Sequence, residues 1–231
     1  MAERFKDLPR SRTISYQPWK LFHCSWSDRQ QPQQIATGLA AGAVECSPAF
    51  YRDADGLHIS FIGGVPTQQC FDYKLYPMSG AAWDSLSAAE PFDNRETWAG
   101  FLSQRYVCFS SSNRLELTRR DTNEQFLLEC PLSRILRVTY RADDLDSLLI
   151  TGVATDENEQ TLLYKIDTTE TFEVRTPDSV YKSSINGDQI VFAQQGDDDF
   201  EDRQLQHGSY TLEAVTNGVT RVAATSTTSA S

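Results

Sequence analysis

The chain has few of the residue patterns that mark catalytic, metal-binding or secreted proteins. Its three histidines, His23, His58 and His207, show no H-x-x-x-H or Cys-His spacing, so a zinc site would depend on chance convergence. No G-x-S-x-G turn is present to hold a nucleophilic serine. The five cysteines form no C-x-x-C pair, and their odd number favours buried free thiols over disulfides. They are Cys24, Cys46, Cys70, Cys108 and Cys130.

Targeting and membrane signals are also missing. No apolar run approaches the roughly 18 to 20 residues that a membrane-spanning helix needs. Residues 1–12 are charged and lack the apolar core of a signal peptide, and no Asn-x-Ser/Thr sequon occurs. These features lead us to expect a protein made and folded in the cytoplasm, without a signal peptide or transmembrane segment.

Excess positive charge is absent as well. With 21 basic and 32 acidic residues the formal charge is −11, which argues against nucleic acid as a partner. The basic groups Arg114 with Arg119–Arg120 and Arg134 with Arg137 are interleaved with acids, and we interpret both as solvated strand faces. The acidic runs at residues 143–146 and 156–159 are interpreted as solvated turns.

What the sequence does contain is a repeat. Runs of apolar and β-branched residues begin at residues 58, 105, 147 and 188, which are 47, 42 and 41 residues apart. Turn residues precede each run, and no long helical pattern lies between them. A period of roughly 40 to 50 residues with strands alone inside each unit is typical of a β-propeller. The sequence therefore predicts an all-β fold.

Each repeat divides into four short strands. The third is the clearest, because Leu162, Tyr164 and Ile166 alternate with other residues at the period of two that strands show. Asn186-Gly187 is a strong hairpin signal in the fourth. The expected strands are residues 43–52, 58–64, 69–76 and 82–86; 96–104, 105–111, 114–120 and 124–130; 135–141, 147–153, 161–167 and 171–175; and 179–185, 188–194, 203–207 and 209–215.

The remaining strand-like pieces suggest how a ring would close. Residues 14–22, 23–26 and 34–37 lie before the repeats and residues 218–223 lie after them, which together are enough for one more blade. We therefore expect five blades, the last joined from both chain ends so that no open edge remains. The single domain would span residues 13–223, between an N-terminal arm (1–12) and a polar C-terminal tail (224–231).

Two segments fit this scheme less well. Asp93 and Glu96 form a capping-box pattern that could open a short helix before Phe101. Residues 34–44 are rich in Ala and Gly and are poor strand material. A β-sandwich with irregular insertions is the alternative fold.

In period, strand count and closure the chain resembles the β-propeller superfamily. Residues 47–61, Ser-Pro-Ala-Phe-Tyr-Arg-Asp-Ala-Asp-Gly-Leu-His-Ile-Ser-Phe, are similar to the blades of sialidase-like and five-bladed glycosidase-like repeats, where a strand, an Asp-Gly turn and a second apolar strand follow one another. On this arrangement we expect seven side chains to be buried between blades. They are Phe61, Val107, Phe109, Leu149, Leu163, Val191 and Phe192.

Several acidic residues are candidates for functional sites. Asp53-x-Asp55-Gly56 begins like a calcium loop, but the rest of that loop is absent and a hairpin turn is the better interpretation. A glycosidase would need two converging carboxylates, and Glu45, Asp28 and Asp178 qualify without any pair standing out. A dense acidic run could attract cations or a basic partner, although a solvated loop is the simpler explanation. It comprises Asp197, Asp198, Asp199, Glu201 and Asp202.

The tryptophans could stack on sugar rings, as in a lectin. However, Trp26 and Trp83 do not occupy equivalent repeat positions, and the third and fourth repeats have no tryptophan. Core packing or a subunit contact is therefore favoured for all four tryptophans, which include Trp19 and Trp98. We assign no catalytic, cofactor-binding or metal-binding residue. The sequence predicts a non-catalytic structural or adaptor subunit of a large protein assembly, for example a virion or phage tail component. A sugar-binding propeller that recognises a cell surface, or a small glycoside hydrolase, is the alternative.

Overall fold

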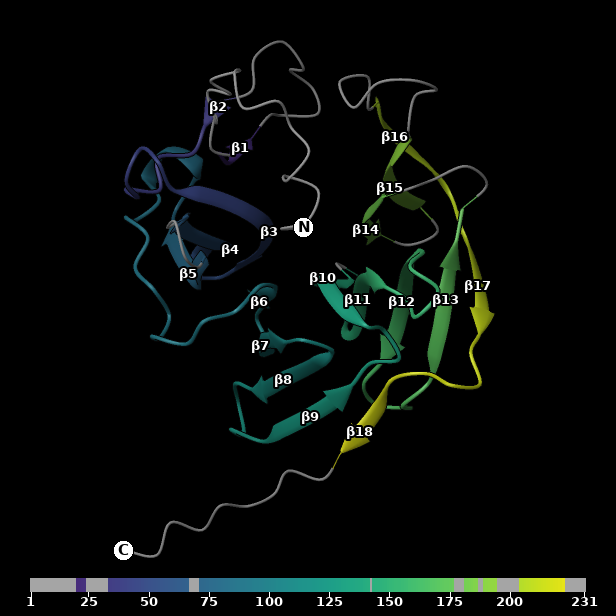
Figure 1. The fold of residues 1–231 in the computed structure, drawn as a ribbon. Coiled ribbons are helices and arrows are strands. Elements are labelled where there is room, and N and C mark those ends of the chain that lie inside the picture. Colours follow the sequence, from purple (N-terminus) through teal and green to yellow (C-terminus); the bar gives the residue numbers. More distant parts are fainter. Residues whose placement is uncertain are drawn as a thin grey trace, which may run out of the picture.

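A computed structural model describes residues 20–23, 33–66, 71–141, 143–176, 181–186, 189–194 and 204–222. The described chain is built from antiparallel β-sheets and one short 3-10 helix, which confirms the expected all-β class. The sheets follow one another in sequence order around the molecule (Figure 1). Five sheets are formed, of two, three or five strands each.

The first repeat forms a three-stranded sheet of β3 (Val44–Asp53), β4 (Gly56–Pro66) and β5 (Phe71–Gly80). The fourth strand predicted at residues 82–86 is wrong, because η1 (Trp83–Ser85) is a 3-10 turn. The chain after η1 instead runs along β5 and donates scattered backbone hydrogen bonds to it, so this outer edge is partly covered. These bonds are Ser87 N to Ser79 O (2.9 Å), Phe92 N to Leu75 O (2.7 Å) and Thr97 N to Tyr73 O (2.8 Å).

The strands of the second and third repeats begin and end within three residues of the prediction, except the first strand of the second repeat, which is much shorter than the predicted residues 96–104. The second comprises β6 (Gly100–Leu102), β7 (Tyr106–Ser111), β8 (Arg114–Arg119) and β9 (Gln125–Glu129). The third comprises β10 (Arg134–Arg141), β11 (Asp144–Val153), β12 (Glu159–Lys165) and β13 (Thr171–Arg175). No helix forms at residues 93–102, where the capping-box pattern gave an alternative; β6 occupies the end of that segment.

The fourth repeat contributes β14 (Tyr181–Asn186), β15 (Gln189–Gln194) and β16 (Gln204–Ser209), which form a three-stranded sheet. Its predicted fourth strand, β17 (Thr211–Ala214), leaves this sheet and pairs with β13. The last strand, β18 (Thr220–Val222), then pairs with β9. The predicted closure of one blade by residues 218–223 and the N-terminal strands is therefore wrong where the chain is described: β18 extends the second-repeat sheet, while β1 (Phe22–His23) and β2 (Gln33–Gln34) pair with each other.

The hydrophobic core is divided among the faces of successive sheets. One cluster joins the outer face of the β3–β5 sheet to the N-terminal segment through Leu21 and Ile35. A second lies between the β3–β5 and β6–β9 sheets and includes Ile62 and Val107. The largest cluster joins the β6–β9 sheet to the β10–β13 sheet, and a small one covers the far face of the latter around Leu149.

Strand alternation explains why both faces of a sheet are buried. On β11, Leu148 and Ile150 face the largest cluster while Leu149 faces the small one. Five of the seven predicted core residues are confirmed, with exposed fractions of 5% or less: Phe61, Val107, Phe109, Leu149 and Leu163. The side chains of Val191 and Phe192 lie outside the described part.

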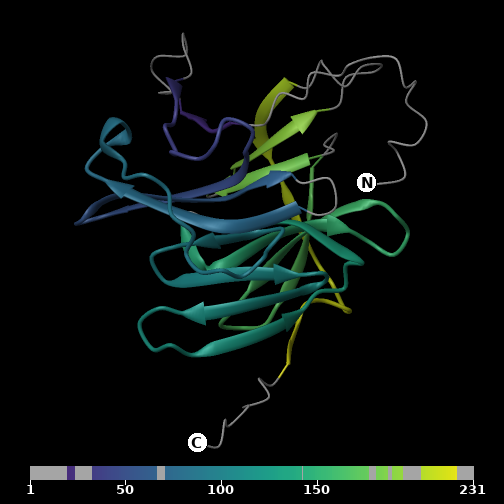
Figure 2. The ribbon, with the colours of Figure 1, turned by 60° about the vertical axis from the view of Figure 1, so that its left-hand side comes forward.

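The first strand of each repeat lies toward the middle of the molecule. β10 contacts β3, β6 and β14, and β3 also contacts β6 (Figure 1). Turning the molecule shows the β3–β5 sheet stacked on the β6–β9 sheet (Figure 2). A hydrogen bond from the Tyr140 hydroxyl to the Phe50 carbonyl (2.6 Å) links β10 to β3 directly.

Candidate functional site

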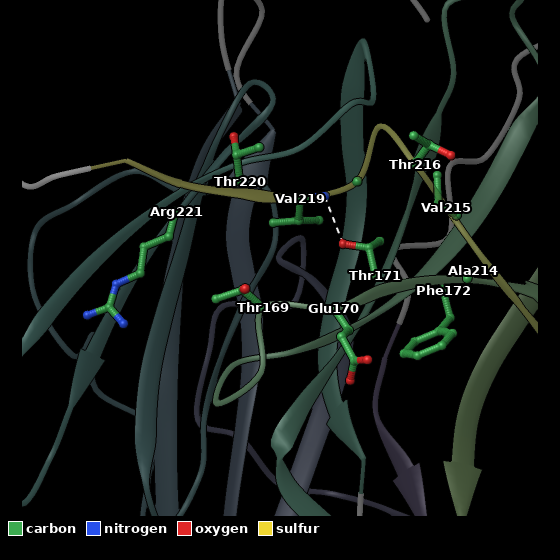
Figure 3. A pocket seen from close by; sticks show the side chains of 11 residues that line it. Thr169, Glu170, Thr171, Phe172, Ala214, Val215, Thr216, Val219, Thr220 and Arg221 are labelled. Atoms are coloured by element: carbon green, nitrogen blue, oxygen red, sulfur yellow. Dashed lines mark hydrogen bonds between the residues drawn. The ribbon is translucent and has the colours of Figure 1, made fainter.

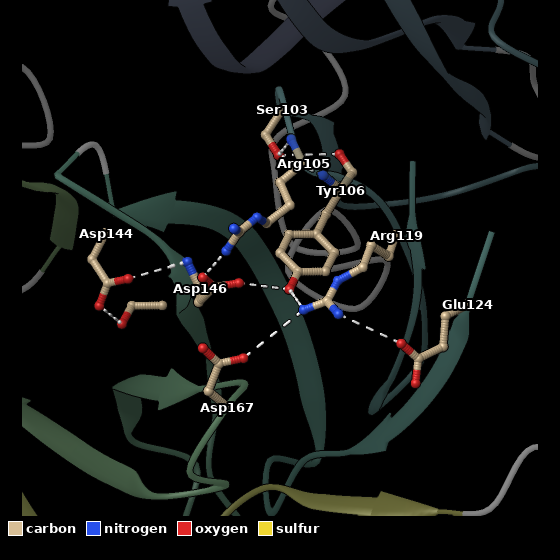
Figure 4. Close-up of polar contacts among 9 residues, drawn as sticks. Ser103, Arg105, Tyr106, Arg119, Glu124, Asp144, Asp146 and Asp167 are labelled. Atoms are coloured by element: carbon tan, nitrogen blue, oxygen red, sulfur yellow. Dashed lines mark hydrogen bonds and ion pairs between the residues drawn. The ribbon is translucent and has the colours of Figure 1, made fainter. Parts of the chain in front are cut away.

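A polar network joins the β6–β9 sheet to the β10–β13 sheet (Figure 4). The Tyr106 hydroxyl on β7 donates to Oδ1 of Asp146 on β11 (2.6 Å) and accepts from Nη2 of Arg119 on β8 (3.0 Å). Arg105 Nη1 donates to the other carboxylate oxygen of Asp146. Arg119 also approaches Glu124 and Asp167, at 3.6 and 3.9 Å. Tyr106 is thus the centre of an inter-sheet contact.

The environment of Tyr106 favours its neutral form. Burial raises its pKa, the adjacent Asp146 carboxylate raises it further, and Arg119 offsets part of this, leaving a pKa of about 12. A phenol held neutral in this way is a hydrogen-bond donor and not a base at neutral pH. The acidic run at residues 143–146 that we expected to be a solvated turn is instead drawn into contacts, since Asp146 binds this network and Asp143 pairs with Arg141 (2.7 Å).

Replacing Tyr106 by Phe should cost about 1 to 2 kcal/mol, because it removes one part-buried hydrogen bond from Asp146 and one from Arg119. Since the folded pKa is raised, this stabilising contribution is complete below pH 10 and is lost as the pH rises from 10 toward 12. Denaturant unfolding of both proteins at pH 8 and pH 11 measures the effect. A difference that stays constant between the two pH values would show that Tyr106 is not held by the network.

A groove of about 470 Å³ lies beside this network, lined by Gln104, Arg105, Asp121 and residues 143–146. A second groove of about 550 Å³ lies where the C-terminal chain crosses from β13 to β9 (Figure 3). There the backbone N–H of Val219 donates to Thr171 Oγ1 (2.9 Å), and Val219 is buried. Among the described residues, no group of three or more His, Cys, Asp or Glu side chains is placed to hold a metal ion.

Glu45, one of the three carboxylates considered for glycoside hydrolysis, is a buried structural residue. Its carboxylate accepts hydrogen bonds from Lys20 Nζ (3.0 Å), Thr37 Oγ1 (2.7 Å) and the Leu21 backbone N–H (3.2 Å). These contacts attach the N-terminal segment to β3. The other two carboxylates, Asp28 and Asp178, lie outside the described residues, as does the acidic run at 197–202.

The Asp53-x-Asp55-Gly56 sequence forms the hairpin turn between β3 and β4, as predicted. Gly56 has a φ of +132°, and a Cβ there would lie 2.4 Å from the Gly80 carbonyl oxygen, so glycine is required. Partial burial raises the pKa of Asp53, but hydrogen bonds from His58 and from the backbone of Asp55 and Gly56 more than offset this and leave the pKa lowered. The Asp53 carboxylate is therefore committed to the turn.

The cysteines agree with the expected free thiols where they are described. Cys108 and Cys130 are buried in the largest core cluster, and burial raises the pKa of both. Cys46 is half-buried on β3. Cys24 and Cys70 lie outside the described residues, together with Trp19, Trp26, the side chain of His207 and the proposed terminal arms.

An aromatic cluster lies at the surface where β1, β3 and η1 meet. The Trp83 ring stacks on the His23 ring with centroids 4.8 Å apart, and the Phe50 ring contacts Trp83 at 6.0 Å. Phe50 is 62% exposed. We call His23, Phe50 and Trp83 the aromatic cluster. Sequence analysis favoured a core or contact role for Trp83, but it could not bring Phe50 and His23 beside it because they belong to different strands.

Comparison with known proteins gave no relative: no protein-family model, curated protein or solved structure matches the chain. Within the described residues, no helix is long and apolar enough to cross a membrane. The function must therefore be argued from the chain's own surfaces.

Proposed function

We infer that the repeats are blades of a small five-bladed propeller, with β1 and β2 belonging to the first blade in chain order. Two observations support this. Consecutive sheets share a hydrophobic cluster between their faces, as adjacent blades do, and the first strands of the repeats contact one another near the middle. The C-terminal strands β17 and β18 would then cover blade edges that would otherwise stay open.

We propose that the protein is a non-catalytic adaptor subunit that binds other proteins of a larger assembly. The observation that carries this proposal is the aromatic cluster. Phe50 is a large apolar side chain exposed on a central strand; its ring contacts Trp83, which in turn stacks on His23, so the three rings form one contiguous aromatic group. Contiguous apolar surface of this kind marks protein interaction sites more often than isolated exposed residues do. Aromatic residues also contribute most of the energy at such interfaces.

Sugar recognition is the second candidate, because exposed aromatic rings can stack on sugar faces. The His23 ring lies almost parallel to Trp83, with an interplanar angle of 4°, so one face of the indole is already occupied. Phe50 meets Trp83 at an angle of 62° and does not extend a flat platform. Both features favour a protein partner over a sugar.

Replacing Phe50 by Ser should weaken partner binding at least about tenfold, since loss of an interface anchor typically costs more than 1 kcal/mol. The measurement is quantitative co-purification of tagged protein from its native source, followed by titration of the recovered partner. Phe92→Ser is the matched control, because Phe92 is also exposed (44%) but packs against Phe109, away from the cluster.

The same preparations separate the alternatives. Saturable binding to a glycan array that is lost in Trp83→Ala would replace the adaptor proposal by sugar recognition. Turnover on a panel of glycosidase substrates, abolished by a single carboxylate substitution, would contradict a non-catalytic role. Equal partner affinity in Phe50→Ser and wild type would remove the aromatic cluster from the interface.

A further inference from the structure

Arg137 is a half-buried arginine near the middle of the molecule, and no polar partner of its side chain lies among the described residues. It lies on β10, which contacts β3, β6 and β14 (Figure 1). Its backbone is opposite Thr151, one residue after a β-bulge that separates the pairs Ile135–Gly152 and Arg137–Thr151. Val138 faces the largest core cluster. Because successive side chains of a strand point to opposite faces, the Arg137 side chain points away from that cluster.

The guanidinium of Arg137 is buried at its Nε edge and accessible at its Nη edge. Its Nε is buried and has no hydrogen-bond partner within the described part of the chain. Of the three guanidinium nitrogens, only Nε is both buried and unpartnered, and the residue as a whole is half-buried. A ligand could therefore reach the Nη edge from solvent.

Other arginines in the described segments differ in this respect. Arg95, Arg105, Arg114, Arg119, Arg141, Arg175 and Arg221 form ion pairs with carboxylates. Arg120 donates to Ser103 O and Tyr51, and Arg52 donates to Ala81 O. Arg134 shows no such contact, but it is exposed and water can solvate it. Arg137 is the part-buried cation among them that lacks a polar partner.

This situation is costly for a protein without a ligand. Burial lowers the pKa of Arg137, which means that its charged form is destabilised where it lies. A buried charge is normally matched by an opposite charge or by hydrogen bonds. The nearby acid on β3, Glu45, is already bound to Lys20 and Thr37 and does not supply that charge.

β3, which contacts the strand of Arg137, carries two neutral hydrogen-bond donors. Cys46 on β3 interacts electrostatically with Arg137, and burial raises the pKa of its thiol, which stays protonated. The neighbouring Ser47 side chain contacts that thiol. Ser47 has a φ of +51° at a second β-bulge, between Cys46 and Ala49, and left-handed backbone at non-glycine residues is concentrated at functional sites. The two bulges thus lie on the two contacting central strands that carry Arg137 and the Cys46–Ser47 pair.

We propose that Arg137, with Cys46 and Ser47, binds a small oxyanion, either phosphate or a carboxylate. The Nη edge of a guanidinium matches two oxygens of such an anion, and charge-assisted hydrogen bonds of this geometry are about twice as strong as neutral ones. The proposed site uses other side chains than the aromatic cluster.

The test is calorimetric titration of the full chain with inorganic phosphate and, separately, with acetate and citrate, at constant ionic strength set with NaCl. Saturable binding of phosphate alone identifies a phosphate site, and binding of acetate or citrate identifies a carboxylate site. Arg137→Gln should weaken the binding at least tenfold. Arg134→Gln, on the same strand and exposed, removes the same charge and should leave the affinity unchanged.

A second measurement does not depend on the folding of a variant. The bound anion should slow alkylation of Cys46 by neutral iodoacetamide in the wild-type protein, read from the Cys46 peptide by mass spectrometry. An absence of saturable binding with all three probes, unchanged affinity in folded Arg137→Gln, or unchanged Cys46 alkylation at saturating anion would each overturn the proposal.

Discussion

Replacing Phe61 by Ala is expected to lower the free energy of unfolding by about 3 to 5 kcal/mol, the usual cost of truncating a fully buried Phe. Phe61 lies on β4 and is 0% exposed. Its ring stacks on Tyr76 with centroids 5.6 Å apart, in the cluster that also holds Leu21 and Ile35. The cavity would therefore loosen both the β3–β5 sheet and the N-terminal segment packed on it.

Denaturant unfolding followed by fluorescence measures this loss. Phe22→Ala is the control, because Phe22 is 56% exposed and should change the free energy by no more than about 0.5 kcal/mol. A loss below about 1 kcal/mol for Phe61→Ala would place its side chain at the surface and contradict the register of β4.

Ending the chain after Asn217 should lower the free energy of unfolding by about 2 to 4 kcal/mol, because the truncation combines the loss of a buried valine with the loss of strand pairing. It removes Val219, which is 4% exposed, and the pairing of β18 with β9. It also removes Arg221, which lies over the Phe126 ring at 3.8 Å and pairs with Glu124 at 3.1 Å. The edge of β9 would then be open to pairing with other chains.

Calorimetric melting and sedimentation velocity test both consequences of this truncation. The shortened chain should melt at a lower temperature and associate increasingly with concentration. Thr220→Ala, an exposed change within β18, is the control and should leave both properties as in the full chain. An unchanged melting temperature in the truncated protein would show that β18 does not hold the β6–β9 sheet.

Local sequence patterns were enough to predict much of the fold. Alternating apolar residues located the strands of the second and third repeats within a few residues, because the period of two depends only on which face is buried. The Asp53 to Gly56 turn was predicted for the same kind of reason, since a tight hairpin needs a residue that tolerates positive φ.

Partners between distant strands could not be predicted in this way. β17 has strand-like residues whether it pairs with β16 or with β13, and the choice depends on which edge is free in three dimensions. The same holds for β18, which we expected beside the N-terminal strands and which extends the β6–β9 sheet instead. Which strand covers an open sheet edge depends on how the sheets assemble, and no local sequence pattern marks it.

For the site residues too, local sequence patterns are not enough, because burial depends on the three-dimensional arrangement. Arg134 and Arg137 look equivalent in sequence, three residues apart on one strand, and we interpreted both as solvated. Ile135 and Val138 both face the largest core cluster across the bulge, so Arg134 and Arg137 lie on the same opposite face, and Arg134 at the end of β10 is exposed while Arg137 farther along it is half-buried. Phe50 likewise looked like part of an ordinary strand, and its exposure beside Trp83 depends on where η1 lies.

Site-specific photocrosslinking at position 50 tests the adaptor proposal most directly. A photoreactive phenylalanine analogue replaces Phe50, which is exposed and adjoins Trp83, and the protein is irradiated in its native surroundings. We predict crosslinks to one defined protein, and none to that protein from the same analogue at position 92. Irradiation that crosslinks position 50 to no protein, or equally to many, would contradict the claim that this surface is an interface.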